Sequence, residues 1–126
     1  MENLKGKTIL LVDDEERNTF ALKNYLETFG IEMIVAENGE LAMSLLQSGA
    51  DADMILLDMM MPVMDGYEVL DALKSDAILK SIPVIAVTAR AMKGDKEKCM
   101  EHGAWDYVSK PIDLHDLMNK INDLIG

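Results

Sequence analysis

The sequence predicts an α/β fold with one open, doubly wound sheet of five parallel strands and five helices. Short apolar runs alternate with amphipathic stretches of helical period, and each run ends at turn or capping residues. Strands separated by helices run parallel, with right-handed crossovers. The 126 residues are enough for one hydrophobic core and too few for two, so a single domain is expected.

The first two strand and helix units are predicted before residue 50. Residues 8–12, Thr-Ile-Leu-Leu-Val, predict a buried strand, and the helix after them ends at Gly30. Residues 31–36 predict the second strand, Asn38-Gly39 a turn, and the second helix ends near Gly49. The expected buried helix faces are Ala21, Leu22, Tyr25, Leu26 and Phe29 in the first, and Leu41, Ala42, Leu45 and Leu46 in the second.

The remaining units follow the same pattern. Residues 54–57, 83–87 and 105–108 predict the third, fourth and fifth strands. Pro62 and Asp65-Gly66 mark a loop before the third helix. The fourth helix is expected to begin at Gly94-Asp95 and to end by Gly103, and Asp113 is expected to cap the fifth. Their expected buried residues are Val69, Leu70 and Leu73 in the third helix, and Leu114, Leu117, Met118, Ile121, Leu124 and Ile125 in the fifth.

Charge and hydropathy exclude several classes of function. The net charge of −11 repels nucleic acid and anionic lipid, so direct DNA binding is not expected. No apolar run approaches the roughly 18 residues of a membrane-spanning helix, and membrane insertion is not expected either. With no secretory signal at the start and a single cysteine, Cys99, the expected compartment is the cytoplasm.

Chemically active side chains follow the predicted strands at their carboxyl ends, where open parallel sheets bind ligands. Asp13 and Asp14 follow the first strand, Asp58 the third, Thr88 the fourth and Lys110 the fifth. Three carboxylates and one ammonium carry −3 + 1 = −2 charges, which one divalent cation neutralises, and oxygen ligands of this kind favour Mg²⁺. A carboxylate beside Mg²⁺ and an ammonium can attack a phosphoryl group, so an aspartyl phosphate at Asp58 is predicted.

Five motifs in this order carry a resemblance to a known family. They are Leu-Val-Asp-Asp-Glu at 11–15, Ile-Leu-Leu-Asp-Met-Met-Met-Pro at 55–62, Met-Asp-Gly at 64–66, Val-Thr-Ala at 87–89 and Ser-Lys-Pro-Ile at 109–112. Together they resemble the signature of response-regulator receiver domains. The resemblance implies one receiver domain over residues 1–126, with its core at about 6–125, and a flavodoxin-like sheet of strand order 2-1-3-4-5. Residues 89–99 look more like receivers fused to hybrid histidine kinases than like those of DNA-binding regulators.

The resemblance also implies roles for the residues at the strand ends. Asp58 is the implied phosphoacceptor. Asp14, Asp58 and the backbone carbonyl of Met60 are the implied Mg²⁺ ligands, and Asp13 acts through metal-bound water. Mn²⁺ is an expected substitute for Mg²⁺.

A switch is implied next to these ligands. Lys110, often followed by a cis Pro111 in the family, contacts a phosphoryl oxygen. Thr88 moves to bond another oxygen, and Tyr107 then turns inward. A local change of charge of this kind biases a bistable surface, expected here on the fourth helix, fifth strand and fifth helix.

The implied function is that of a phosphoacceptor switch in two-component signalling. The donor is a histidine kinase or a histidine phosphotransfer protein, and the output protein is unknown. The chain is not expected to be an enzyme beyond its own phosphorylation and dephosphorylation. The alternative is a phosphorylation-independent protein-binding module of the same fold.

Three residues bear on how this chain differs from the family that it resembles. Met60 and Arg90 are expected to flank the phosphoryl group, and apolar Met60 offers hydrolytic water no strong hydrogen bond, which predicts slow self-dephosphorylation. Trp105 precedes the Asp106-Tyr107 pair, where the family often has a small polar residue. The indole either anchors a partner or covers a neighbouring helix, and the sequence favours neither reading.

Other chemistries fit the sequence less well. Cys99-x-x-His102 offers only two ligands without a second pair, which argues against zinc, and neither His102 nor His115 has the surroundings of a phosphohistidine donor. A phosphatase of the haloacid dehalogenase type needs a second aspartate where Met60 stands. A nucleotide-binding module needs a phosphate-cradling loop where the acidic residues 13–16 stand.

Overall fold

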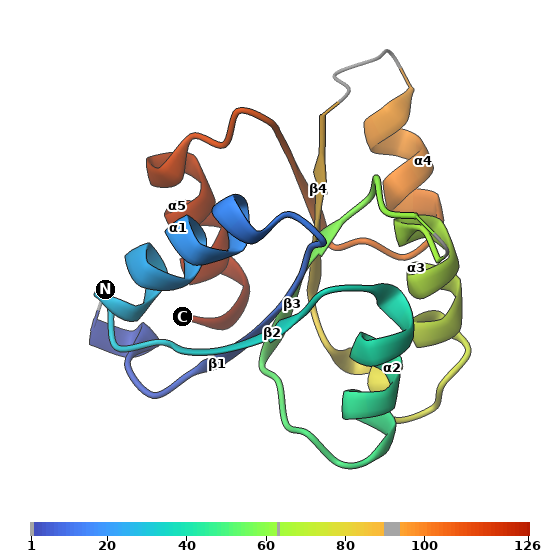
Figure 1. Ribbon diagram of the computed structural model, residues 1–126, viewed down its shortest axis with the longest axis horizontal. Helices are drawn as coiled ribbons and strands as arrows, with labels where there is room; N and C mark the ends of the chain where they lie inside the picture. The colour runs from blue at the N-terminus through green and yellow to red at the C-terminus, as the bar shows by residue number, and fades with distance from the viewer. Residues whose placement is uncertain (1, 63, 90–93) are drawn as a thin grey trace.

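The fold is a three-layer α/β arrangement around one parallel sheet, seen in a computed structural model that describes residues 2–62, 64–89 and 94–126 (Figure 1). The strands are β1 (Thr8–Val12), β2 (Glu32–Ala36), β3 (Met54–Asp58), β4 (Val84–Thr88) and β5 (Asp106–Ser109). All pair in parallel, in the order β2-β1-β3-β4-β5. The expected fold class and strand order are confirmed.

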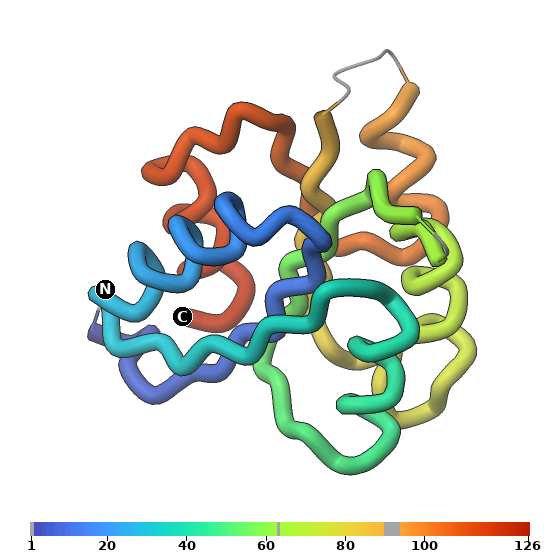
Figure 2. Tube along the Cα trace, viewed as in Figure 1, coloured from blue at the N-terminus to red at the C-terminus, as the bar shows by residue number. Residues whose placement is uncertain are grey.

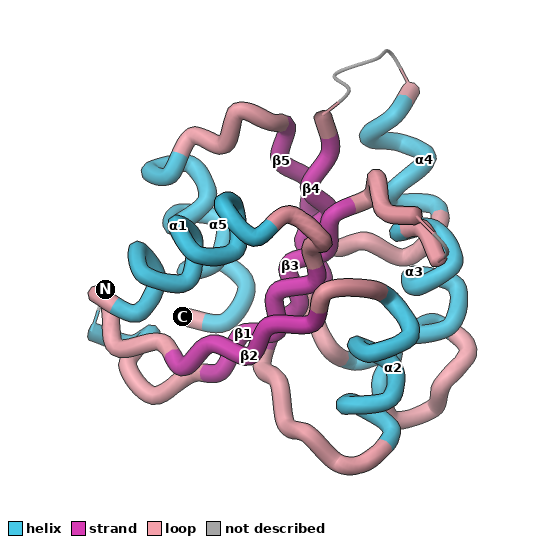
Figure 3. Tube along the Cα trace, viewed as in Figure 1, coloured by secondary structure: helices cyan, strands magenta, loops and turns pink. Residues whose placement is uncertain are grey.

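The helices cover both faces of the sheet. They are α1 (Glu16–Glu27), α2 (Gly39–Gln47), α3 (Gly66–Lys74), α4 (Asp95–Glu101) and α5 (Leu114–Ile125). Helices α1 and α5 lie on one side of the strands, and α2, α3 and α4 lie on the other (Figure 3). Two short 3₁₀ turns, η1 (Glu2–Leu4) and η2 (Leu79–Ser81), were not predicted.

The alternation of side chains along each strand divides the core into two halves. Leu10 and Leu57 face α2 and α3, whereas Leu11 and Leu56 face α1 and α5. Leu4 of η1 joins the second half, beside α5, so the start of the chain folds back against its last helix (Figure 2). No helix among the described residues is long and apolar enough to cross a membrane.

Capping side chains mark the starts of α2, α3 and α5. Asp113 caps α5 by accepting a hydrogen bond from the backbone of Asp116 at 3.1 Å, as its position predicts. Asp65 and Glu68 form a capping box at the start of α3. Asn38, expected in a turn, accepts a hydrogen bond from the backbone of Leu41 and caps α2.

Some boundaries and exposures differ from prediction. Strand β4 starts at Val84 because the nitrogen of Pro83 has no hydrogen to donate. Strand β5 starts at Asp106, the first of its residues paired with β4. Leu41 and Leu114 were expected to be buried but are exposed, and each lies in the first turn of its helix. Ala21 is also exposed, at the margin of the buried face of α1.

Candidate functional site

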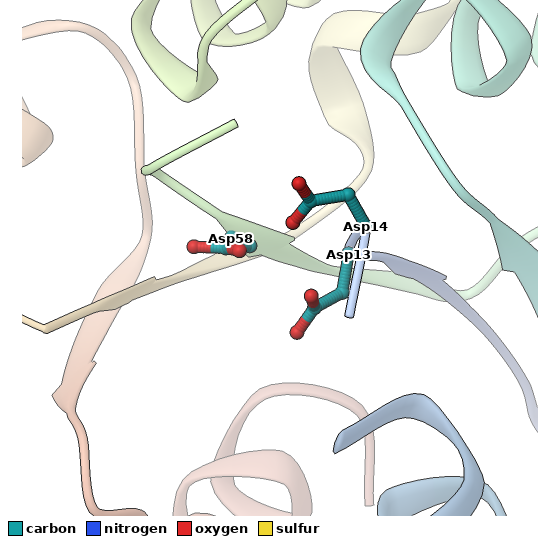
Figure 4. A group of neighbouring side chains, drawn as sticks. All are labelled: Asp13, Asp14 and Asp58. Carbon is teal, nitrogen blue, oxygen red and sulfur yellow. The ribbon is translucent and has the colours of Figure 1, made fainter. Parts of the chain in front are cut away.

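Three carboxylates meet at the carboxyl ends of β1 and β3. Val12 is in register with Leu57, so the next residues along the two strands, Asp13 and Asp58, are neighbours. Asp14 follows directly, and one carboxylate oxygen from each of the three lies within 4.8 Å of the others (Figure 4). The structure therefore brings together the acidic residues that the sequence singled out.

Two of these carboxylates are buried, and backbone N–H groups hold them. Asp13 and Asp58 are each only 4% exposed, whereas Asp14 is open to solvent. The backbone of Glu15 donates to Asp13 Oδ1 at 2.8 Å, and the backbone of Met60 donates to Asp58 Oδ1 at 3.0 Å. Burial raises the pKa of Asp13; the Glu15 bond opposes this, and the charge of Asp58 raises the pKa further.

A lysine reaches into the same cluster from β5. Lys110 directly follows the last residue of that strand, and its backbone donates to the carbonyl of Thr88 at 2.7 Å. Its Nζ lies 3.7 Å from Asp58 Oδ2 and 4.0 Å from Asp13 Oδ2. The Lys110–Pro111 peptide is cis, as the resemblance implied. One ammonium thus faces two buried carboxylates.

A close backbone approach fixes the loop after Asp58. Gly66 begins α3, and its N–H points to the carbonyl of Met59 at 3.4 Å. A Cβ at Gly66 would lie 2.7 Å from the Met59 Cα, closer than real Cβ atoms approach backbone. Only glycine therefore lets α3 pack directly against the segment that carries Met60.

The expected switch residues lie on the neighbouring strands. Thr88 is buried at the end of β4, one residue beyond the partner of Asp58 in the ladder. Tyr107 lies on β5 opposite Ala86, half-buried, and its hydroxyl donates to Asp95 Oδ2 at 3.3 Å. Thr88 therefore lies on the strand that borders Asp58, and Tyr107 lies on the next strand, β5.

Asp95 of α4 has two tyrosine partners, neither of which was predicted from the sequence. The hydroxyl of Tyr67, on α3, donates to Asp95 Oδ1 at 3.1 Å, so one carboxylate of α4 accepts hydrogen bonds from two tyrosines. Burial raises the pKa of both Tyr67 and Tyr107, and the charge of Asp95 adds to each shift. No local pattern in the sequence links Tyr67 to residues so far along the chain.

A family model for the response regulator receiver domain matches residues 9–122. The chain belongs to the response-regulator receiver family. It therefore takes part in two-component signal transduction, and phosphorylation of an aspartate is typical of this family.

Similar receivers cover nearly the whole chain. The polar-differentiation response regulator DivK of Brucella anthropi is 39% identical over 120 residues, which are 95% of this chain and 97% of that protein. The receiver domain of Francisella response regulator 1452 is 30% identical, with a TM-score of 0.88, over 95% of this chain and 97% of that chain. The receiver domain of the Pseudomonas aeruginosa sensor histidine kinase PA1611 is 30% identical, with a TM-score of 0.83, over 96% and 98% of the two chains. Receivers of both response regulators and sensor histidine kinases are thus among the similar proteins.

The acidic cluster fits a divalent cation. Octahedral Mg²⁺ takes oxygen ligands at about 2.1 Å, so its ligands lie within about 4.2 Å of one another. The three carboxylate oxygens lie within 4.8 Å of one another, so they need to move only slightly closer to bind the ion. Receivers bind Mg²⁺ at an acidic pocket, and the PA1611 receiver structure has a magnesium ion coordinated in its active-site cleft. Among the described residues, Asp13, Asp14 and Asp58 form the only His, Cys, Asp or Glu group with metal-site geometry.

The remaining sequence candidates are placed as follows. Met60 is 52% exposed beside Asp58, and Trp105 is exposed immediately before β5. Because the acidic cluster is at the carboxyl ends of the strands, Trp105 lies at the opposite end of the sheet. His102 pairs with Asp71 at 2.7 Å. The prediction for Arg90 falls outside the described residues.

Proposed function

We propose that Asp58 is the phosphoacceptor of a single receiver domain formed by residues 1–126, with its core at about 6–125. The observation that carries the proposal is the position of Asp58. Its carboxylate is buried, one oxygen accepts the N–H of Met60, and the other faces Lys110 at 3.7 Å. This second oxygen is the nucleophile that attacks phosphorus.

In the proposed transfer, the Asp58 carboxylate forms a bond to the phosphorus of a phosphohistidine. The phosphorus–nitrogen bond of the donor breaks, and the electron pair returns to the imidazole. Lys110 neutralises charge on a phosphoryl oxygen, a contribution of the kind that dominates catalysis of phosphoryl transfer. Thr88 contacts another oxygen, and Tyr107 then leaves Asp95 and turns inward.

Asp13, Asp14, Asp58 and the carbonyl of Met60 would hold Mg²⁺, and Mn²⁺ is proposed to substitute for it. When bound, the metal supplies positive charge that offsets the repulsion between the carboxylates and the incoming phosphoryl group. Burial and the charge of Asp58 both raise the pKa of Asp13, and a cation at this position would oppose that effect.

The proposed phosphodonor is a histidine kinase or a histidine phosphotransfer protein, which must cover the surface around Asp58. Beside Asp13 and Asp14 lies a hollow of about 370 Å³ that reaches Val35 and Leu41. A neighbouring groove of about 430 Å³ continues from Val35 to Phe20, which is 70% exposed on α1. The exposed apolar side chains of Phe20, Val35 and Leu41, set among polar residues next to the acidic cluster, support docking of the donor there.

The proposed output face is formed by α4, β5 and α5, and its partner is unknown. Trp105 is the candidate anchor at the far end of this face from Asp58. If the indole anchors the partner, Trp105→Ala weakens partner binding without altering phosphorylation. If affinity is unchanged, the indole serves only to cover its neighbours.

The protein is proposed to catalyse no reaction other than its own phosphorylation and dephosphorylation. A cytoplasmic location stays a prediction from the sequence. The alternative, a binding module that works without phosphorylation, shares the fold but does not need the acidic cluster to react.

The test is intact-mass analysis after incubation with acetyl phosphate, with and without Mg²⁺. Wild type should gain one phosphoryl group only with the metal, and Asp58→Asn should gain none. Asp53→Asn, a carboxylate at the opposite end of β3, serves as the control and should behave as wild type. Absence of any adduct on wild type would refute the phosphoacceptor role and favour the phosphorylation-independent module.

A further inference from the structure

Three consecutive methionines follow the proposed phosphoacceptor, and only the middle one is open to solvent. Met59 and Met61 are 3% and 6% exposed and pack in the core between the sheet and α3. Met60 is 52% exposed, more than any other described methionine. A water-borne oxidant therefore reaches the sulfur of Met60 while its two neighbours are shielded.

The exposed thioether is also tied to the site. The backbone N–H of Met60 donates to Asp58 Oδ1 at 3.0 Å, which keeps the residue in contact with the carboxylate. The close packing of Gly66 on Met59 fixes the same segment from behind. The side chain of Met60 therefore starts at the rim of the acidic cluster and ends in solvent.

We infer that Met60 is an oxidation site through which a peroxide shortens the lifetime of the phosphoryl group on Asp58. A lone pair of the Met60 sulfur attacks one oxygen of hydrogen peroxide, the oxygen–oxygen bond breaks, and the products are methionine sulfoxide and water. Sulfur is oxidised by two electrons and the peroxide is reduced. The inference rests on the proposed function, because Asp58 must carry the phosphoryl group whose lifetime changes.

The physical reason is the change in polarity at the rim. A thioether is a weak hydrogen-bond acceptor, so it does not orient a water molecule beside the phosphorus. A sulfoxide is polar, and its oxygen accepts a hydrogen bond from water. Water held there is positioned for attack on the acyl phosphate. Because Met60 is not part of the packed core, its oxidation does not require the core to repack.

The experiment compares each protein with itself before and after treatment with limiting hydrogen peroxide. Wild type, Met60→Leu and Met100→Leu are treated, mapped by peptide mass analysis, then phosphorylated with acetyl phosphate and Mg²⁺. After removal of the donor, loss of the phosphoryl group is followed by intact mass. Among the methionines that the structure describes, Met100 on α4 is the other exposed one, and it provides the matched control.

In wild type and Met100→Leu, the sulfoxide should form at Met60 and the phosphoryl lifetime should fall about fivefold, the effect of one ordinary hydrogen bond made only in the transition state. Methionine sulfoxide reductase should restore the lifetime, and Met60→Leu should keep its own lifetime after peroxide. An unchanged phosphoryl lifetime with Met60 fully oxidised, or an equal fall of the lifetime in Met60→Leu, would overturn the inference. Either outcome would leave the proposed function intact. If untreated wild type takes up no phosphoryl group, the proposed function fails and the inference fails with it.

Discussion

Replacing Asp13 by asparagine is expected to stabilise the metal-free protein. The substitution is isosteric, and the asparagine Oδ1 can still accept the N–H of Glu15, which lies at 2.8 Å from Asp13. It removes a negative charge from a residue that is only 4% exposed. The change therefore isolates the free energy of holding this charge in the folded protein.

The Coulomb contributions nearly cancel. At an effective dielectric constant of about 20, repulsion from Asp58, at 4.8 Å or less, is about 3.5 kcal/mol or more, and attraction to Lys110 at 4.0 Å is about 4 kcal/mol. Exposed Asp14 adds about 1 kcal/mol of repulsion in water. The cost that remains is desolvation, which is also the largest cause of the raised pKa of Asp13.

With the Glu15 hydrogen bond offsetting part of this cost, Asp13→Asn should raise the free energy of unfolding by about 1–2 kcal/mol at neutral pH in EDTA. For 126 residues, that corresponds to a rise in Tm of about 4–8 °C. In wild type, Mg²⁺ at ten times its Kd should raise the free energy of unfolding by about 1.4 kcal/mol. In Asp13→Asn, the same ion should raise it by less.

The assay is thermal unfolding followed by circular dichroism, in EDTA and in Mg²⁺, from about pH 4 to pH 8. The folded-state pKa of Asp13 lies above its ordinary value of 3.8. The cost of its charge is therefore absent below the ordinary pKa and complete above the raised one, so the advantage of Asp13→Asn should grow with pH. Asp14→Asn is the control and should change stability by less than about 1 kcal/mol, because its charge is exposed. A variant less stable than wild type in EDTA, or an advantage independent of pH, would refute the reasoning.

Further predictions concern the loop, the lifetime, the docking surface and α4. Gly66→Ala should lower the free energy of unfolding by about 1–3 kcal/mol in urea titrations, because its Cβ would meet the Met59 backbone. Met60→Asn should shorten the phosphoryl lifetime by holding hydrolytic water, and an unchanged decay of the phosphorylated mass would contradict this. Phe20→Ala should slow transfer from the phosphodonor but not from acetyl phosphate, whereas Ile78→Ala, exposed at the other end of the sheet, should affect neither. Asp95→Asn should lower the pKa of Tyr107 in ultraviolet titrations, since the carboxylate charge adds to the effect of burial.

The site residues could be predicted from the sequence where their position depends only on the ends of the strands. Parallel strands place their carboxyl ends at one edge, so the residues after the apolar runs were expected to converge, and Asp13, Asp14, Asp58, Thr88 and Lys110 lie there. The motif around Asp58 and the cis Lys110–Pro111 peptide followed from family resemblance. The predicted strand starts were one residue early at β2, β4 and β5, because each strand begins at the first residue that pairs with its neighbour.

The sequence by itself determined the order of the elements, their buried faces and the chemistry at the strand ends, because these depend on local periodicity and on residue types. Only the tertiary structure decided how helices meet one another. It placed Tyr67 and Tyr107, from α3 and β5, on the single carboxylate of Asp95. It also left Phe20 and Met60 open to solvent while it buried Met59 and Met61. Exposure and side-chain pairing across elements depend on how helices dock against the sheet, which no local pattern specifies.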